Sequence, residues 1–194
     1  MRVIAGSAGG IPLRLPKTEL RPTMDMVRGA IFSSLGEATV GARVLDLFAG
    51  TGSLAIEALS RGAESATLVE ADRKACEVIA ENLKQTRLKA NVLCMDVFRF
   101  LEKEGGTAAF DLIFADPPYA KDAGARDFAA ELLRNQGVLG ALQENGLLVL
   151  EVGQRWVLPE CSEWECVRRK RYGSTETLFF VKRTSRMTPE LSVE

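Results

Sequence analysis

Short apolar segments alternate with segments of helical period from about residue 42 onwards. Buried strands are expected at Arg43–Leu47, Ala66–Glu70, Asn91–Met95, Phe110–Ala115 and Gly146–Val152. Helices are expected between them at Ser53–Arg61, Asp72–Gln85, Val97–Glu104 and Asp127–Asn135. This alternation predicts an α/β fold with a doubly wound, mostly parallel sheet that carries helices on both faces.

Single residues mark the expected ends of two of these helices. Ser53 is the expected N-cap of the first helix, and Gly62 stands where a C′ glycine belongs. Asp72 is expected to cap the next helix, in which apolar residues from Cys76 to Leu83 recur at helical spacing. The second helix therefore has one apolar face.

The two ends of the chain differ from its middle. The later segments Glu165–Tyr172 and Thr175–Lys182 are separated by Gly173 and Ser174, a pattern that predicts an antiparallel hairpin. At the other end, Thr23 is expected to cap a helix over about residues 24–35.

A small β arm is expected before that helix, because Arg2–Ala5 and Leu13–Leu15 flank three glycines and Pro12. We expect a single domain over residues 1–194. Within it, residues 1–40 form the arm and helix, residues 41–184 the core, and residues 185–194 a frayed tail.

The composition limits the chemistry. The chain has 194 residues, no histidine, and four cysteines without C-x-x-C spacing. The absence of histidine excludes Ser-His-Asp and Cys-His catalysis and histidine-ligated metals. We expect reduced cysteines and no metal. Because no signal peptide or membrane span is visible, we also expect a cytoplasmic protein.

Basic residues gather at both ends of the chain, although the net charge is only −1. Residues 1–28 contain five basic and two acidic residues, and residues 155–186 contain eight basic and four acidic ones. Such a surface is either a solvated face or a contact to nucleic acid, and charge alone does not decide between them. The candidate contacts to RNA are Arg2, Arg14, Lys17, Arg28, Arg168, Arg169, Lys170 and Arg171.

A glycine-rich loop joins the first expected strand to the first helix, where open α/β sheets bind ligands. Gly50 and Gly52 allow close approach of the backbone, and with Ala55 they satisfy the dinucleotide fingerprint G-x-G-x-x-G/A. Asp46 argues against a dinucleotide, because its carboxylate would crowd a pyrophosphate, whereas it suits the ammonium of an amino-acid ligand. The candidate residues of this loop are Asp46, Phe48, Ala49, Gly50 and Gly52.

Acidic residues also end the next two strands. Glu70 is placed to bind both ribose hydroxyls, which NAD and S-adenosylmethionine share. Asp96 is placed to meet an adenine amino group, and it can also cap the helix that begins at Val97.

The segment Asp116-Pro117-Pro118-Tyr119 follows the fourth strand. The exocyclic amino group of a base is a poor nucleophile, because its lone pair is delocalised into the ring. The Asp116 carboxylate and the Pro117 carbonyl can accept hydrogen bonds from both N–H groups, which turns the lone pair toward a methyl donor. Tyr119 offers a ring on which an extruded base can stack. The segment therefore predicts methyl transfer to a base amino group.

These motifs resemble those of class I S-adenosylmethionine-dependent methyltransferases of the amino-group type. The chain carries DLFAGTG at residues 46–52, then Glu70, Asp96 and DPPY, in that order. The N-terminal MRVIAGSAGG, Arg21-Pro22-Thr23 and AIFSSL, with YGST at residues 172–175, resemble the RsmD family of 16S rRNA guanine-N2 methyltransferases. The resemblance extends to about Lys182. DPPY alone also occurs in DNA adenine methyltransferases.

The resemblance implies a Rossmann-like fold, S-adenosylmethionine as donor, and a guanine of 16S rRNA in the small ribosomal subunit or its precursor as acceptor. The implied donor-site residues are Asp46, Gly50, Gly52, Glu70, Asp96, Arg21, Pro22 and Thr23. The implied base-binding residues are Asp116, Pro117 and Tyr119. Two positions depart from the family pattern, since Met26 and the Gly9-Gly10 pair stand where basic residues are usual.

The sequence leaves three alternatives open. A DNA N6-adenine methyltransferase would share the donor residues and DPPY, but the chain offers no obvious target-recognition domain. A non-catalytic rRNA-binding assembly factor would keep a vestigial donor pocket. An NAD-dependent oxidoreductase is suggested only by the glycine fingerprint. No segment indicates a dimer, so a monomer is expected.

Overall fold

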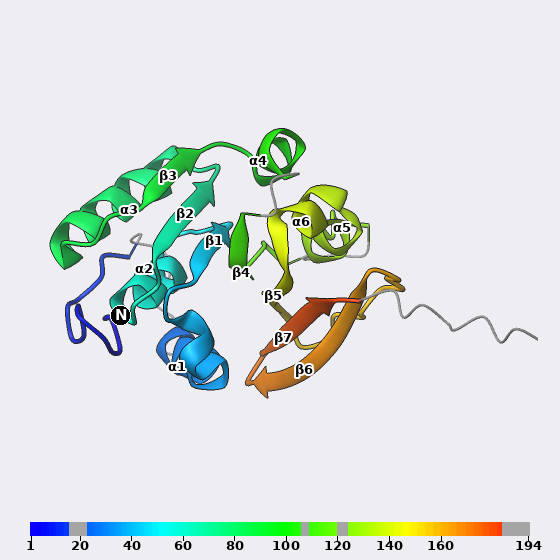
Figure 1. Ribbon diagram of the computed structural model, residues 1–194, viewed down its shortest axis with the longest axis horizontal. Helices are drawn as coiled ribbons and strands as arrows, with labels where there is room; N and C mark the ends of the chain where they lie inside the picture. Colours follow the sequence, from blue (N-terminus) through cyan, green and yellow to red (C-terminus); the bar gives the residue numbers. More distant parts are fainter. Residues whose placement is uncertain (16–22, 106–108, 120–123, 184–194) are drawn as a thin grey trace, which may run out of the picture.

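A seven-stranded sheet runs through the centre of the molecule (Figure 1). The computed structural model describes residues 1–15, 23–105, 109–119 and 124–183. The strands are β1 (Arg43–Leu47), β2 (Ser65–Glu70), β3 (Asn91–Cys94), β4 (Phe110–Ala115), β5 (Leu142–Gly153), β6 (Trp164–Tyr172) and β7 (Thr175–Lys182). The helices are α1 (Thr23–Leu35), the 3-10 helix η1 (Gly36–Thr39), α2 (Ser53–Ser60), α3 (Arg73–Thr86), α4 (Val97–Glu104), α5 (Phe128–Arg134) and α6 (Gln136–Ala141).

The strand order is β3-β2-β1-β4-β5-β7-β6. Strands β1 to β5 are parallel, and β7 is antiparallel to both of its neighbours. The carboxyl ends of the five parallel strands therefore meet at one edge of the sheet, where ligands bind in this class of fold.

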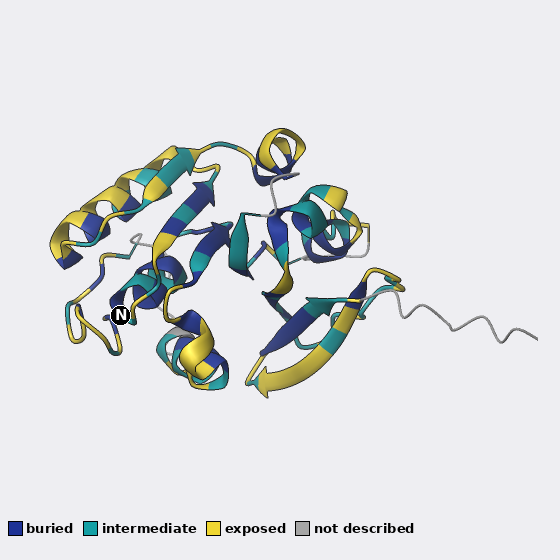
Figure 2. Ribbon diagram, viewed as in Figure 1, coloured by how far each residue is buried: buried dark blue, intermediate teal, exposed yellow. Residues whose placement is uncertain are grey.

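Helices cover both faces of the sheet, because parallel strands are apolar on both sides. Helices α1, α2 and α3 pack on the face that carries Val44, Leu68 and Phe114. Helices α4, α5 and α6 pack on the other face, against Leu45 and Ile113. Figure 2 shows the inner strands as largely buried and β6 as largely exposed. The predicted doubly wound α/β fold with an antiparallel C-terminal hairpin is confirmed.

Helix α6 and the first residues of β5 are not predicted by the sequence pattern. The helix has six residues and contains two glycines, so it shows no helical period. A Cβ on Gly137 would lie 2.6 Å from the Leu101 carbonyl oxygen, and a Cβ on Gly105 would lie 2.4 Å from the Cα of Gly137. Close packing against the end of α4 therefore determines this helix.

The start of α2 corrects one expectation, because Gly52 and not Ser53 is its N-cap. Gly52 has a φ of 74°, in the left-handed region that glycine adopts without strain. The amide of Ala55 in the first turn donates to Asp46 Oδ2 at 3.1 Å. A side chain from β1 thus takes the place of a serine cap. Gly62, with a φ of 99°, follows the helix as predicted.

The N-terminal segment forms a loop with an isolated bridge between Arg2 and Pro12, and not the two short strands expected. Pro12 has no N–H group, so it cannot donate to a longer ladder. The loop is fastened to the end of α2, where the Ala8 amide donates to Ser60 Oγ at 2.9 Å. Gly6, with a φ of 83°, lies against the same residue, and a Cβ there would be 1.7 Å from the Ser60 carbonyl oxygen.

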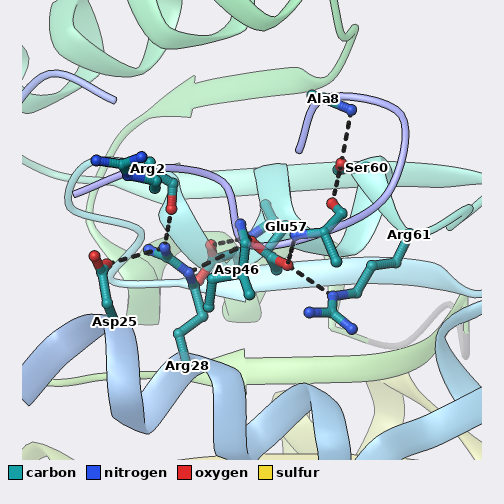
Figure 3. Close-up of polar contacts among 11 residues, drawn as sticks. Arg2, Ala8, Asp25, Arg28, Asp46, Glu57, Ser60 and Arg61 are labelled. Carbon is teal, nitrogen blue, oxygen red and sulfur yellow. Dashed lines mark hydrogen bonds and ion pairs between the residues drawn. The ribbon is translucent and has the colours of Figure 1, made fainter. Parts of the chain in front are cut away.

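Arg28 lies inside this junction (Figure 3). Its side chain is 3% exposed, donates to Asp25 Oδ1 at 3.0 Å and to the Arg2 carbonyl, and lies 3.6 Å from Glu57 Oε2. Glu57 is fully buried and accepts hydrogen bonds from two backbone amides of the loop and from Arg61. The prediction that Arg28 contacts RNA is therefore wrong. Its guanidinium joins the N-terminal loop, α1 and α2.

Candidate active site

The loop after β1 is built on Asp46, whose side chain is 2% exposed. Burial raises the pKa of Asp46 to about 8, the hydrogen bond from the Ala55 amide opposes this, and the charge of Glu70 adds to it. A cation bound beside a buried carboxyl favours the charged form. Asp46 is therefore suited to an ammonium group.

The raised pKa predicts a pH dependence of stability in the ligand-free protein. The folded state keeps the Asp46 proton up to a pH of about 8, whereas the unfolded chain releases it near 4, so stability is lost as the pH rises between these values. We expect the free energy of unfolding of the wild type to fall between pH 5 and pH 8, relative to that of Asp46→Asn, by more than about 1.4 kcal/mol. Urea titrations of both proteins at each pH measure this. Parallel pH profiles would contradict it.

The backbone of the same loop is left-handed at three positions. Phe48, Gly50 and Gly52 have φ angles of 58°, 55° and 74°. Phe48 is not a glycine, and such a conformation persists only where the surroundings hold it. Its ring packs edge-on against Phe98 and Phe128, with centroids 6.3 and 5.8 Å away. Among the described residues, and apart from its two chain neighbours, a Cβ on Gly50 would meet nothing closer than the Phe48 carbonyl oxygen at 4.0 Å, so a ligand can approach this backbone.

Gly52 differs from Gly50, because a Cβ there would lie 2.9 Å from Leu68 Cδ2 and 3.3 Å from Ile79 Cγ2. We expect Gly52→Val to abolish binding of S-adenosylmethionine in calorimetry, because both the clash and the positive φ displace the loop. Gly41→Val is the matched control. Gly41 has a φ of 71° and precedes β1, but in the part of the chain that the structure describes, beyond its two neighbours, no atom lies within 4 Å of a Cβ placed there. Equal donor affinity in the Gly52 variant and the wild type would move the donor site elsewhere.

Glu70 at the end of β2 holds the glycine loop from the side. Its Oε2 accepts from the Gly50 amide at 2.8 Å, and its Oε1 accepts from the Asp72 amide at 2.8 Å. Asp96 caps α4, with Oδ1 accepting from the Arg99 amide at 3.0 Å, as predicted. The contacts of Glu70 with ribose hydroxyls and of Asp96 with adenine stay predictions.

The DPPY segment follows β4, directly beside this loop. Strands β1 and β4 are neighbours, and the Asp116 amide donates to the Leu47 carbonyl at 3.4 Å. Asp116 is half-buried and Pro117 is buried. The fixed φ of Pro117 and Pro118 stiffens the segment. The acceptor groups proposed for an amino group therefore lie beside the glycine loop.

Tyr119 ends this segment and points at the neighbouring strands. Its hydroxyl donates to Glu151 Oε1 at 3.1 Å and lies 3.3 Å from Thr175 Oγ1. Burial raises the pKa of Tyr119, and the charges of Glu151 and Asp116 raise it further, so the phenol stays protonated. A cavity of about 550 Å³ opens here, which is large enough for a nucleobase. Its lining includes Pro117, Pro118, Tyr119, Glu151, Gly153 and Trp156.

The structure leaves some predicted residues undescribed and adds one that sequence reasoning missed. Arg21, Pro22 and Lys17 lie outside the described residues, as does the side chain of Thr23. Glu151 is the addition. Its signal in the sequence was a carboxylate at the end of an apolar strand, the same signal that identified Glu70.

The strand order and the site define the class of protein. A dinucleotide fold has the order 3-2-1-4-5-6, whereas here the antiparallel β7 lies between β5 and β6. Carboxylates lie at or near the carboxyl ends of four neighbouring strands, close to the glycine loop: Asp46 in β1, Glu70 at the end of β2, Asp96 after β3 and Asp116 after β4. This arrangement suits an amino-acid nucleoside as ligand. The protein is an S-adenosylmethionine-dependent methyltransferase.

Comparison with known proteins gives the family. The model of the family described as Conserved hypothetical protein 95 matches residues 1–181. Ribosomal RNA small subunit methyltransferase D of Escherichia coli is 34% identical, over 89% of this chain and 85% of that protein. YlbH of Bacillus subtilis is 38% identical, over 94% of this chain and all of that protein. The solved structure of Escherichia coli yhhF superposes with a TM-score of 0.79 at 33% identity, covering 96% of this chain and 99% of that chain. The chain belongs to this family, the RsmD family.

Proposed function

We propose that this protein transfers the methyl group of S-adenosylmethionine to the exocyclic N2 of a guanine in 16S rRNA, on the small ribosomal subunit or its precursor. The observation that carries the proposal is the position of the DPPY segment, between the glycine loop and the 550 Å³ cavity. Support for the substrate comes from the relatives named as small subunit methyltransferases.

The chain's own residues position the acceptor. S-adenosylmethionine supplies an electrophilic methyl group when bound. The Asp116 carboxylate and the Pro117 carbonyl accept the two amino N–H groups, which aims the nitrogen lone pair at that methyl group. The Tyr119 ring forms a wall of the cavity, where the extruded base can stack, and its hydroxyl is held by Glu151.

The exposed side chains of β6 support an RNA surface beside this site. Arg168, Arg169, Lys170 and Arg171 are all exposed. Arg168 donates to the Ser34 carbonyl and Lys170 to Ser34 Oγ at the end of α1, while Arg169 pairs with Glu176 of β7. These contacts order the basic side chains without removing them from solvent. Arg2 and Arg14 are exposed as well, Arg14 in an ion pair with Glu81.

Location and assembly are expectations from the sequence. Among the helices that the structure describes, none has the length and apolarity needed to cross a membrane. The cytoplasmic location and the monomeric state both stay predictions. Sedimentation of the purified protein measures its oligomeric state.

The test is transfer of tritiated methyl groups to small ribosomal subunits that lack the modification, beside protein-free rRNA and genomic DNA, followed by nucleoside analysis. Label in N2-methylguanosine of the particle is expected. Label in N6-methyladenine of DNA would show that the acceptor is DNA adenine, and the proposed donor site would still stand. If the protein binds the particle but transfers no label, it acts as an assembly factor. If it binds a nicotinamide cofactor and does not bind S-adenosylmethionine, it is an oxidoreductase.

The basic strand gives a further prediction. We expect the double variant Lys170→Glu and Arg171→Glu to weaken binding of the particle and to reduce the slope of log affinity against log salt by about two. Lys84→Glu with Lys89→Glu is the matched control, because both residues are exposed and precede β3, the strand at the opposite edge of the sheet. If filter binding gives the same slope for both double variants, β6 is a solvated face.

A further inference from the structure

Glu151 lies next to the DPPY segment because of the sheet register. Strands β4 and β5 are parallel, and Ala115 pairs with Leu150, so the residues that follow, Asp116 and Glu151, stand side by side at the carboxyl edge. Glu151 is half-buried and lines the same cavity as Pro117 and Tyr119. The Glu151 carboxylate therefore borders the cavity proposed for the base, on the strand next to Asp116.

We propose that Glu151 determines the specificity for guanine by accepting a hydrogen bond from the ring N1–H beside the reacting amino group. This inference rests on the proposed function. In the proposed function, Asp116 and Pro117 bind the amino group of any acceptor base, and Glu151 is the residue that selects guanine among them.

The selectivity follows from the hydrogen-bonding edges of the bases. Guanine, adenine and cytosine all carry an exocyclic amino group. In guanine, the ring nitrogen next to the amino-bearing carbon on the Watson–Crick edge is N1–H, a donor. The corresponding nitrogens are N1 in adenine and N3 in cytosine, and both are acceptors with a lone pair. A carboxylate accepts from the first and is repelled by the other two, so a single side chain separates guanine from both.

The contacts of Glu151 keep its carboxylate at this edge. The Tyr119 hydroxyl donates to Oε1 at 3.1 Å, and it remains a donor because burial and the neighbouring carboxylates raise the pKa of Tyr119. Thr175 of the adjacent β7 lies 3.3 Å from the same hydroxyl. A carboxylate oriented by a protonated phenol is a fixed acceptor, and fixed polar groups discriminate best.

The experiment compares guanosine with 2,6-diaminopurine riboside at the target position of reconstituted small subunits. Diaminopurine keeps the N2 amino group but has an unprotonated N1. We expect the wild type to prefer guanosine by at least about 100-fold in kcat/KM, because a site built around a substrate N–H rejects an analogue that lacks it. Glu151→Gln is expected to reduce this preference to within about tenfold, since an amide can donate to N1 as well as accept from N1–H. An unchanged preference in Glu151→Gln overturns the inference.

The variant Tyr119→Phe distinguishes two roles of Glu151, direct selection of the base and positioning of Tyr119. It removes the hydrogen bond that orients Glu151 but keeps the carboxylate, so it is expected to lower the preference for guanosine less than Glu151→Gln does. Equal loss of preference in Tyr119→Phe and Glu151→Gln would mean that Glu151 acts only through Tyr119, and would overturn the inference. Calorimetric affinity for S-adenosylmethionine in each variant confirms an intact donor site. If the wild type methylates no guanosine, both the proposed function and this inference fail. If the wild type is active and Glu151→Gln keeps its preference for guanosine, the inference alone fails.

Discussion

Replacement of Asp116 by alanine is expected to lower the single-turnover rate of methyl transfer by about 10²–10³-fold, the usual loss when a preorganised polar group is removed from a reacting centre. Affinity for S-adenosylmethionine should stay within a few fold, because Asp116 follows β4 and the glycine loop is held by Asp46 and Glu70. Rapid-quench measurement with saturating donor gives the rate, and calorimetry gives the donor affinity.

The control for this variant lies on the same strand. Asp111→Ala removes a carboxylate from the start of β4, where Asp111 binds the half-exposed Arg43 at 2.9 Å. It should retain turnover and lose only a little stability, because an ion pair this exposed is worth about 0–1 kcal/mol. Normal turnover by Asp116→Ala, or an equal loss in Asp111→Ala, would remove Asp116 from the reaction.

The second large effect is on stability. We expect Glu57→Ala to reduce the free energy of unfolding by about 3–5 kcal/mol, because the guanidinium of Arg28 stays buried but loses one of its two carboxylate partners. Burial already lowers the pKa of Arg28, and the carboxylates of Asp25 and Glu57 oppose this. The variant also deprives two amides of the N-terminal loop of their acceptor. Urea unfolding followed by circular dichroism measures the change.

An exposed ion pair provides the comparison for Glu57. Glu131→Ala breaks an ion pair with Arg126 that is closer, at 2.7 Å against 3.6 Å for Arg28 and Glu57, but whose side chains are 41% and 51% exposed. It should cost no more than about 1 kcal/mol. If the two variants lose equal stability, burial of the Arg28–Glu57 pair has no energetic weight, and the junction in Figure 3 is held by apolar contacts instead.

The parallel core could be predicted from sequence because each strand is short, apolar and followed by a residue with a distinct local role. Asp72 and Asp96 cap their helices as their positions indicate, and Gly62 ends α2. The cap of α2 could not be predicted in this way. Asp46 supplies it from another element, and only the three-dimensional arrangement brings the two together.

The residues of the candidate site likewise fall into those that the sequence predicts and those that only the fold reveals. Asp116 belongs to the contiguous DPPY motif and Glu70 ends a predicted strand, so the sequence alone brings both to the carboxyl edge of the sheet, beside the glycine loop. The hydrogen bonds of Glu151 with Tyr119 and of Glu57 with Ile4 join residues 32 and 53 positions apart, and no local pattern predicts such pairings. The charge of Arg28 predicts a surface position, but its ion pair with the buried Glu57 is visible only in the fold.

The strand order also bears on how the protein is made. β7 follows β6 in the chain, yet it lies between β5 and β6 in the sheet. On the translating ribosome, β6 therefore emerges before the strand that connects it to the sheet, and β5 presents an unpaired edge until β7 appears. Unpaired edges of nascent chains invite aggregation, so β5 carries this risk during the interval before β7 emerges. Closure of the sheet by β7 then protects that edge and brings Thr175 to Tyr119, so the acceptor pocket is complete only after β7 has paired with β5.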